Sequence, residues 1–458
     1  MRAALVAICL ITILSADFAK ASAPQARAAD ARSPLFSSYT PLALRLEAPL
    51  SDLFGHKSID DGYSVRGTLS YSDNGRPVTI RDVKVSVRGH TSRRQGECTF
   101  PKLKLDFPST DETGPLFDGM KSVKIGTHCG DSDGDQLTGR FGRLANENSP
   151  LREALVYRLL DVFGVPTLRA RPARIAYIDG EQKRERNAVI VEGDGEAMKR
   201  LGGRRGIPPE AFTSARAMFS ESDSARVALA EAMIGNFDWC VKFYDGDTYR
   251  CDARRKLWNV EAVELTNGGV RPIIYDFDVA GMVAGKHAWF SSVFNPAFDD
   301  SGSPPDLEVL GQVQRTRSLF TRSTLDAART HFVERKKDAY AALDASDVDD
   351  RGRQLIREYL DAFFRGIESD TAFYRQVVVA PGTRPFADAD RARAVCPALG
   401  AIPVGTPISS AIDSRGGMEQ VVLLDALWKW APPQNCPEIH KAPVWIPSSA
   451  VSADYPKR

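Results

Sequence analysis

Hydrophobic and polar residues alternate along several short segments in the first half of the chain. Alternation with a period of two is typical of half-buried strands, because successive side chains of a strand point to opposite faces. It predicts strands over residues 41–50, 63–72, 82–89, 100–107, 122–126, 173–179 and 187–193.

The segment SPLREALVYRLLDVFG, residues 149–164, has the spacing of a helix. Ser149 suits the N-cap, Pro150 the first helical position and Gly164 the stop. We expect further helices in the stretch that ends at Gly235 and over residues 305–370. Between these two helical stretches, KLWNVEAVEL and RPIIYDFDVAG predict a strand pair with a turn at Asn267-Gly268-Gly269.

The first 23 residues have the pattern of a secretory signal peptide. A positive charge at Arg2 precedes the apolar run Ala4–Leu14, and small residues follow, with cleavage after Ala21 preferred. The alternative is a membrane anchor, but the run is too short to span a bilayer comfortably. We therefore predict an exported protein, periplasmic or extracellular, with no stable membrane insertion after cleavage.

Charge and cysteine content narrow the class of protein. The 60 Lys and Arg residues balance 59 Asp and Glu residues, which gives no indication of a nucleic-acid partner. Cys9 lies in the signal peptide, and an even number of cysteines in an exported chain favours disulfides over zinc, for which no ligand spacing is present. We predict pairing between sequence neighbours, as Cys98–Cys129, Cys240–Cys251 and Cys396–Cys436.

The composition changes near residue 380, at APGTRP. The segments IPVGTPISS and VWIPSSAV predict short strands with tight turns, and residues 388–455 resemble a bacterial SH3-like barrel. Three tryptophans could form an aromatic groove there or fill a small core: Trp428, Trp430 and Trp445.

Two acidic residues interrupt the apolar run PIIYDFDVAG. If this run is a strand, Asp276 and Asp278 share a face, and like charges at that distance repel unless a cation or donor lies between them. A divalent metal is one such partner. The alternative is that one Asp caps a turn and the other forms a salt bridge.

Asp238 follows a predicted helix that stops at Gly235, and a carboxylate on such a loop can accept a hydroxyl proton. Asn259, in WNVEAV, then enters a strand. A base, an asparagine and a metal-binding aspartate in this order are the parts of kinase-type phosphoryl transfer, in which charge on the phosphate oxygens must be neutralised.

With these motifs in place, the chain resembles the CotH kinase family. The resemblance rests on VRGHTS, CTFPKLKLDF, SPLREALVYRLL, MIGNFDW and YDFDVAG, over about residues 80–285. It implies an α+β, atypical protein-kinase-like two-lobed fold over residues 34–375, with an N-lobe over about 34–193 and a C-lobe over about 194–375. It also implies ATP and Mg²⁺ or Mn²⁺ as cofactors.

The resemblance assigns roles to the acidic residues. Asp238 would be the catalytic aspartate, Asp276 and Asn259 would bind the metal, and Asp278 would be an additional metal-side carboxylate. The chain departs from the family pattern through an insertion between Asp238 and Asn259. Because of that insertion, Asp245 or Asp247 is an alternative to Asn259.

Lys102 and Lys104 alternate with the leucines of FPKLKLDF, so both lie on one face, where ordinary solvated lysines are the common case. The family pattern favours Lys104 for the ATP phosphates, with Lys102 as the second candidate and Glu153 as the partner of the lysine.

The loop RGHTSRRQGE could cover phosphates through backbone N–H groups and Arg93, or it could be an ordinary basic turn. Backbone groups near Glu192 and Gly193 would meet the adenine, by the resemblance alone.

The expected reaction is transfer of the ATP γ-phosphoryl group to a hydroxyl on a protein substrate or a cell-envelope component. ATP is scarce outside the cytoplasm, which keeps open a second class, a catalytically inactive kinase-like binding or scaffold protein of the cell envelope. A third class is a phosphodiester- or carbohydrate-acting enzyme that uses the acidic pair with a metal.

Overall fold

The computed structural model describes residues 33–58, 62–94, 96–108, 113–129, 147–247, 251, 255–284, 305–395, 401–409, 411–423 and 443–454. The predicted signal peptide and the predicted Cys396–Cys436 pair lie outside these residues. Within them, no helix is both long enough and apolar enough to cross a membrane.

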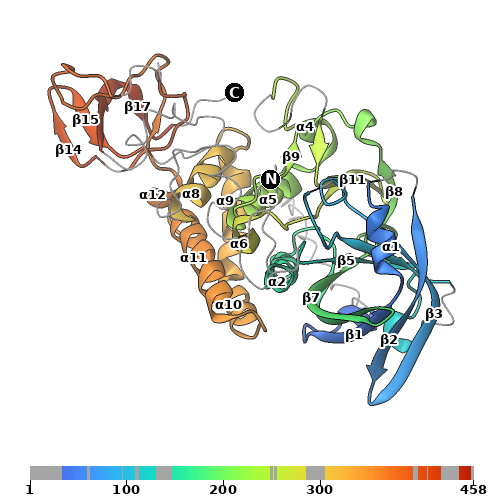
Figure 1. Cartoon of the computed structure of the whole chain (residues 1–458). Coiled ribbons are helices and arrows are strands. Elements are labelled where there is room, and N and C mark those ends of the chain that lie inside the picture. The colour runs from blue at the N-terminus through green and yellow to red at the C-terminus, as the bar shows by residue number, and fades with distance from the viewer. Residues whose placement is uncertain are drawn as a thin grey trace, which may run out of the picture. The chain divides into compact units, whose positions relative to one another are not determined.

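Seven strands close into a barrel in the order β1-β2-β3-β4-β5-β7-β6. Figure 1 shows β1, β2, β3, β5 and β7 of this barrel in blue to green. The bounds are β1 (Leu42–Glu47), β2 (Ser64–Asp73), β3 (Arg76–Val87), β4 (Leu103–Asp106), β5 (Ser122–Gly126), β6 (Ala170–Asp179) and β7 (Gln182–Glu192). Each predicted strand of this region overlaps one of them.

The barrel closes through β1 and β6, which pair in parallel with Leu42 opposite Ala173. The other neighbouring strands pair antiparallel, and β1 also leads into the short helix α1 (Leu50–Gly55). Apolar side chains at alternate positions fill the interior, among them Leu46, Leu69 and Ile190. The opposite side chains of β4 and β5, including Lys104 and Lys124, therefore lie on the outer face of the barrel.

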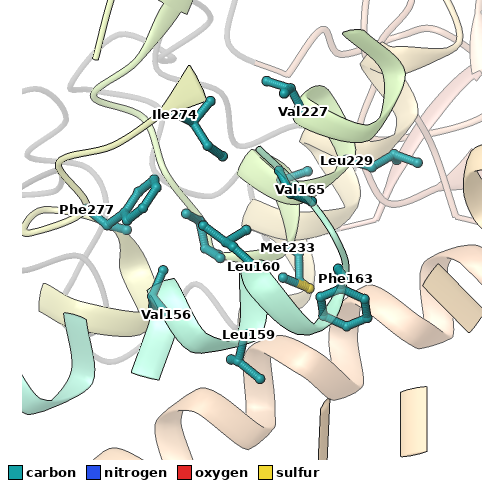
Figure 2. Packing of buried hydrophobic residues seen from close by; sticks show 14 of the residues in the cluster. Val156, Leu159, Leu160, Phe163, Val165, Val227, Leu229, Met233, Ile274 and Phe277 are labelled. Carbon is teal, nitrogen blue, oxygen red and sulfur yellow. The ribbon is translucent and has the colours of Figure 1, made fainter. Parts of the chain in front are cut away.

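Helix α2 (Ser149–Val162) has Asn148 in the N-cap position and Pro150 in its first turn. The sequence predicted Ser149 as the N-cap, so the helix begins one residue earlier than predicted. It is buried on nearly all sides because it packs between the barrel and the following helices. Figure 2 shows its apolar side chains gathered with those of neighbouring elements: Val156, Leu159, Leu160, Phe163, Met233, Ile274 and Phe277.

The second half of the domain combines helices with a small sheet. The sheet has the order β12-β11-β8, from β8 (Gly203–Ile207), β11 (Val260–Leu265) and β12 (Val270–Ile274). The predicted strand pair is thus confirmed as β11 and β12, whereas β8 was not predicted, because GGRRGI lacks an alternating apolar pattern. The longer helices are α5 (Glu221–Met233), α8 (Pro305–Thr316), α9 (Arg322–Glu334), α10 (Lys336–Asp344) and α11 (Asp350–Ile367).

Short strands continue to the end of the described chain. They are β13 (Val377–Val378), β14 (Asp413–Arg415), β15 (Met418–Val421), β16 (Val444–Pro447) and β17 (Val451–Ser452). Trp445 is buried, which agrees with the core alternative, while Trp428 and Trp430 lie outside the described residues. The described strands form one three-stranded and one two-stranded sheet, so the SH3-like barrel stays a prediction.

Two of the three predicted disulfides are confirmed, Cys98–Cys129 and Cys240–Cys251. Disulfides are typical of oxidising compartments. They are compatible with the predicted export but do not establish it.

Candidate functional site

A cleft of about 660 Å³ lies beside the loop Gly89–Ser92 and the sheet β12-β11-β8. This volume is in the range of small-molecule sites. Five predicted site residues line the cleft together: Lys102, Asp238, Asn259, Asp276 and Asp278. They come from four separate segments of the sequence, so the fold gathers them.

Lys102 is the cation that meets the acidic pair. Its Nζ forms an ion pair with Asp276 Oδ1 and lies 2.9 Å from Asp278 Oδ2, while its side chain is only 7% exposed. The ammonium group therefore offsets the repulsion between the two carboxylates. The prediction that both carboxylates share a strand face is wrong, because β12 ends at Ile274 and Asp276 has a φ of 66°.

Asp276 is held in this left-handed conformation, which is uncommon for a residue other than glycine. Its backbone N–H donates to the Tyr157 hydroxyl at 3.0 Å. Burial, followed by the charges of Glu153 and Asp276, keeps the pKa of Tyr157 well above its ordinary value, so the hydroxyl stays protonated. We did not predict this role for Tyr157, although its position four residues after Glu153 places both side chains on one face of α2.

Glu153 lies next to the same segment. Glu153 is 3% exposed, and its carboxylate accepts a hydrogen bond from the Phe277 backbone N–H. Burial raises the pKa of Glu153, and the nearby charge of Lys102 opposes that rise. Lys102 forms ion pairs with both aspartates, and its charge also acts on Glu153, which in addition fixes the backbone beside Asp276.

The carboxylate of Asp238 is oriented from several sides. Its Oδ1 accepts from Trp258 Nε1 at 3.0 Å, and its Oδ2 accepts from Asn259 Nδ2 at 3.2 Å. The Asp238 N–H donates to Asn236 Oδ1 at 3.0 Å. Asn259 in turn accepts the Tyr275 N–H on its backbone oxygen at 3.2 Å, which connects the Asp238 loop directly to the segment that carries Asp276.

The amide of Asn259 has a defined orientation. Its Nδ2 donates to the Asp238 carboxylate and, at 2.6 Å, to the Asp238 backbone oxygen. Both amide hydrogens are thereby used, and the remaining polar atom of the side chain, Oδ1, is an acceptor. Trp258, which also binds Asp238, is a second residue that sequence reasoning missed, although it stands directly before Asn259.

The oxygen atoms of Asp276, Asp278 and Asn259 fit the chemistry of Mg²⁺ or Mn²⁺. Mg²⁺ is usually held by one or two carboxylates together with substrate phosphates and water, so a full cage of protein ligands is not required. The described residues contain no group of three or more His, Cys, Asp and Glu side chains placed to hold a metal ion.

The geometry of the cleft favours Lys102 over Lys104. Lys104 Nζ pairs with Asp106 at 2.6 Å, its side chain is 41% exposed, and it is not among the described residues that line the cleft. Two residues along an extended strand are about 7 Å apart, so lysines that share a face still reach different groups.

The described residues that line the cleft do not include Arg93, Glu192 or Gly193, which were predicted to contact the ATP phosphates and base. Arg93 donates to the Val87 backbone oxygen and does not line the cleft. Glu192 binds Arg200 at 2.7 Å, and its backbone N–H donates to the Arg169 oxygen. The Gly193 oxygen accepts the Ala197 N–H at the start of α3 (Asp194–Arg200), so these backbone groups have partners within the fold.

The alternative metal-side residues in the insertion lie elsewhere. Asp247 is buried, and its Oδ2 accepts the Phe243 N–H at 3.0 Å, which is a turn-capping contact. Neither Asp245 nor Asp247 is among the described residues that line the cleft. The geometry therefore favours Asn259.

Comparison with known proteins adds little to this geometry. No family model matches the chain, and no curated protein matches it. Among solved structures it is similar to the crystal structure of a Helicobacter pylori proinflammatory kinase, CtkA, at 10% sequence identity and a TM-score of 0.30, over 59% of this chain and 92% of that chain. A likeness this weak carries no functional conclusion, and the CotH family resemblance stays a prediction from the sequence motifs.

Proposed function

We propose that this chain is a CotH-like kinase that transfers the γ-phosphoryl group of a nucleoside triphosphate to a hydroxyl on a protein or cell-envelope component. The observation that carries the proposal is the single cleft lined by Lys102, Asp238, Asn259 and both aspartates of the DFD segment. A cation, an oriented carboxylate and a set of hard oxygen ligands are the parts that phosphoryl transfer requires.

In the proposed reaction, Lys102 binds phosphate oxygens of the donor. Asp238 accepts a hydrogen bond from the acceptor hydroxyl and takes its proton, since its carboxylate is already fixed by Trp258 and Asn259. Asp276, Asp278 and the Asn259 Oδ1 would hold Mg²⁺ or Mn²⁺, which supplies positive charge to the phosphate oxygens. Glu153 and Tyr157 act as positioning residues through the backbone N–H groups of Phe277 and Asp276.

One observation favours the alternative of an inactive scaffold. Lys102 binds both Asp276 and Asp278, so the acidic pair is neutralised within the protein. A catalytic site must rearrange these contacts when nucleotide and metal bind, whereas a scaffold keeps them. Thermal unfolding with and without Mg²⁺ and nucleotide separates the two, because a ligand bound only by the folded state raises the midpoint.

The direct test is transfer of label from a γ-labelled nucleoside triphosphate to the protein itself or to a generic protein acceptor, with Mg²⁺ or Mn²⁺. We expect Asp238→Asn and Asp276→Asn to lower labelling by at least about 100-fold. Lys104→Met serves as the matched surface control for Lys102→Met and should label like the wild type. Equal labelling by all of these proteins would exclude the proposed reaction.

A further inference from the structure

One end of the cleft carries ionisable groups that the proposed phosphoryl transfer does not use. Glu261 of β11 and Asp194 of α3 line this end, beside Tyr275. Lys124 of β5 forms an ion pair with Asp194 and lies 5.8 Å from the centroid of the Tyr275 ring. Asp194, Glu261 and Tyr275 are distinct from the Lys102–Asp276–Asp278 cluster but line the same cleft.

The position of this end matches that of a nucleobase. Glu261 is two residues beyond Asn259, whose φ of 54° marks the turn into β11, and Tyr275 immediately precedes Asp276. In a nucleotide, the ribose separates the base from the phosphates, so phosphates at Lys102 place the base further along the cleft. The partly buried apolar residues Met198 and Ile207 also line the cleft and could pack on the face of a base.

Glu261 carries a carboxylate that the described fold itself does not use. No ion pair or side-chain hydrogen bond from the described part of the chain engages its carboxylate. Lys124 is held by Asp194, and Glu261 is among the residues that line the cleft. Both oxygens of an ionised carboxylate can only accept hydrogen bonds.

We propose that Glu261 reads the nucleobase and that the cleft prefers guanine nucleotides to adenine nucleotides, which rests on the proposed function. An ionised carboxylate is matched by two adjacent N–H donors. Guanine presents such a pair, the ring N1–H and the 2-amino group, and also an acceptor at O6. Adenine presents only its 6-amino group as donor and places the N1 lone pair beside it, opposite the second carboxylate oxygen.

The substitution Glu261→Gln is expected to reverse the base preference. A glutamine offers one acceptor and one donor, which matches the 6-amino group and N1 of adenine and opposes one of the two guanine donors. The variant should therefore bind ATP more tightly than GTP, the reverse of the wild type. Each change should amount to about tenfold or more, since a bidentate contact discriminates between bases by roughly that factor.

The test is calorimetric titration of the full chain with GTP, ITP and ATP in the presence of Mg²⁺. ITP keeps the ring N1–H and O6 of guanine but lacks the 2-amino group, so we expect the affinity order GTP, ITP, ATP for the wild type. Glu264→Gln is the control, because Glu264 lies on the same strand, binds Arg204 and Arg205, and does not line the cleft. It should keep the wild-type order.

Outcomes separate this inference from the proposed function. If ATP binds the wild type as tightly as GTP or more tightly, or if Glu261→Gln keeps the wild-type order, base reading by Glu261 is wrong while the nucleotide site stands. If none of the three nucleotides binds, the proposed function fails and the inference falls with it. Thermal unfolding without nucleotide checks folding, and we expect Glu261→Gln not to lower the midpoint, because it removes a partly buried charge.

Discussion

At the scale of single residues, Lys102 decides the charge balance of the cleft. Its ammonium group is nearly buried and lies between two carboxylates. Removing one partner of a buried ionic group leaves uncompensated charge, which costs more than removing an exposed pair. Lys104 is only two residues away, but it and its partner Asp106 are both substantially exposed to solvent. Removing Lys104 therefore leaves no buried uncompensated charge.

We therefore predict that Lys102→Met lowers the free energy of unfolding by roughly 1–3 kcal/mol. This is less than for breaking a fully buried ion pair, because the two aspartates are partly solvated. Lys104→Met should change it by less than about 1 kcal/mol. Denaturant unfolding of both variants and the wild type measures the difference. An equal effect of the two substitutions would contradict the central position of Lys102.

A second residue-scale prediction concerns His128, which is 1% exposed and packs against the ring of Phe100. Neither of its ring nitrogens has a hydrogen-bond partner in the described part of the chain. Burial, followed by the charges of Arg186 and Arg184, lowers the pKa of His128 to about 3. The neutral imidazole is thus the form that the fold accepts.

The sign of the pH effect follows from linkage. Below its ordinary pKa of about 6.5, an unfolded His128 binds a proton that the folded one does not. The contribution of His128 is therefore complete above that pH and is lost as the pH falls toward 3, by about 1 kcal/mol per pH unit. Unfolding at pH 7.5 and pH 5 should show a smaller loss for His128→Phe than for the wild type, and an identical loss would refute the assignment.

At the scale of elements, α2 organises the acidic segment that follows β12. Glu153 and Tyr157 lie one turn apart and accept the consecutive N–H groups of Phe277 and Asp276. The apolar side of the helix meanwhile packs against the core that includes Ile274 and Phe277 (Figure 2). One buried helix thus fixes both the position and the backbone conformation of this segment.

Tyr157→Phe removes the acceptor of the Asp276 N–H and leaves the ring. We predict a fall in kcat of about tenfold or more with a smaller change in KM, because the carboxylate is misplaced while nucleotide contacts remain. Tyr71→Phe is a suitable control, since Tyr71 is also buried and donates to the Thr113 oxygen inside the barrel. Both variants should lose about 1 kcal/mol of stability, so equal activities would contradict the positioning role of Tyr157.

At the scale of the whole molecule, covalent links support the parts that border the cleft. Cys240–Cys251 closes part of the insertion between Asp238 and Asn259, and Trp258 of β10 (Leu257–Trp258) pairs with Cys240 of β9 (Cys240–Val241). Cys98–Cys129 joins the segment before β4 to the segment after β5. The first link constrains the Asp238 loop, and the second constrains the barrel.

The double variant Cys240→Ser with Cys251→Ser should lose about 3 kcal/mol of stability, as expected for a loop of this length. It should also lose activity under conditions in which it stays folded, because Asp238 is less well fixed. Unfolding and label transfer at low temperature measure both effects. Full activity of the folded variant would show that the hydrogen bonds from Trp258 and Asn259 suffice without the disulfide.

Several features could be predicted because they depend on local pattern. Alternation indicated the barrel strands, and the spacing of SPLREALVYRLL indicated α2. Two disulfides between sequence neighbours followed from cysteine order. The order of Asp238, Asn259 and Asp276 indicated a common site, and the three residues do line one cleft.

Other features were decided by contacts between segments that are distant in the sequence. Closure of the barrel depends on Leu42 meeting Ala173, and the conformation of Asp276 depends on a hydroxyl from α2. Alternation predicted one face for Lys102 and Lys104, but a shared face does not specify which position along the chain meets a distant segment. By itself the sequence determined which residue types and elements this protein has. Only the tertiary structure decided which lysine reaches the aspartates, because that depends on how the barrel packs against the DFD segment.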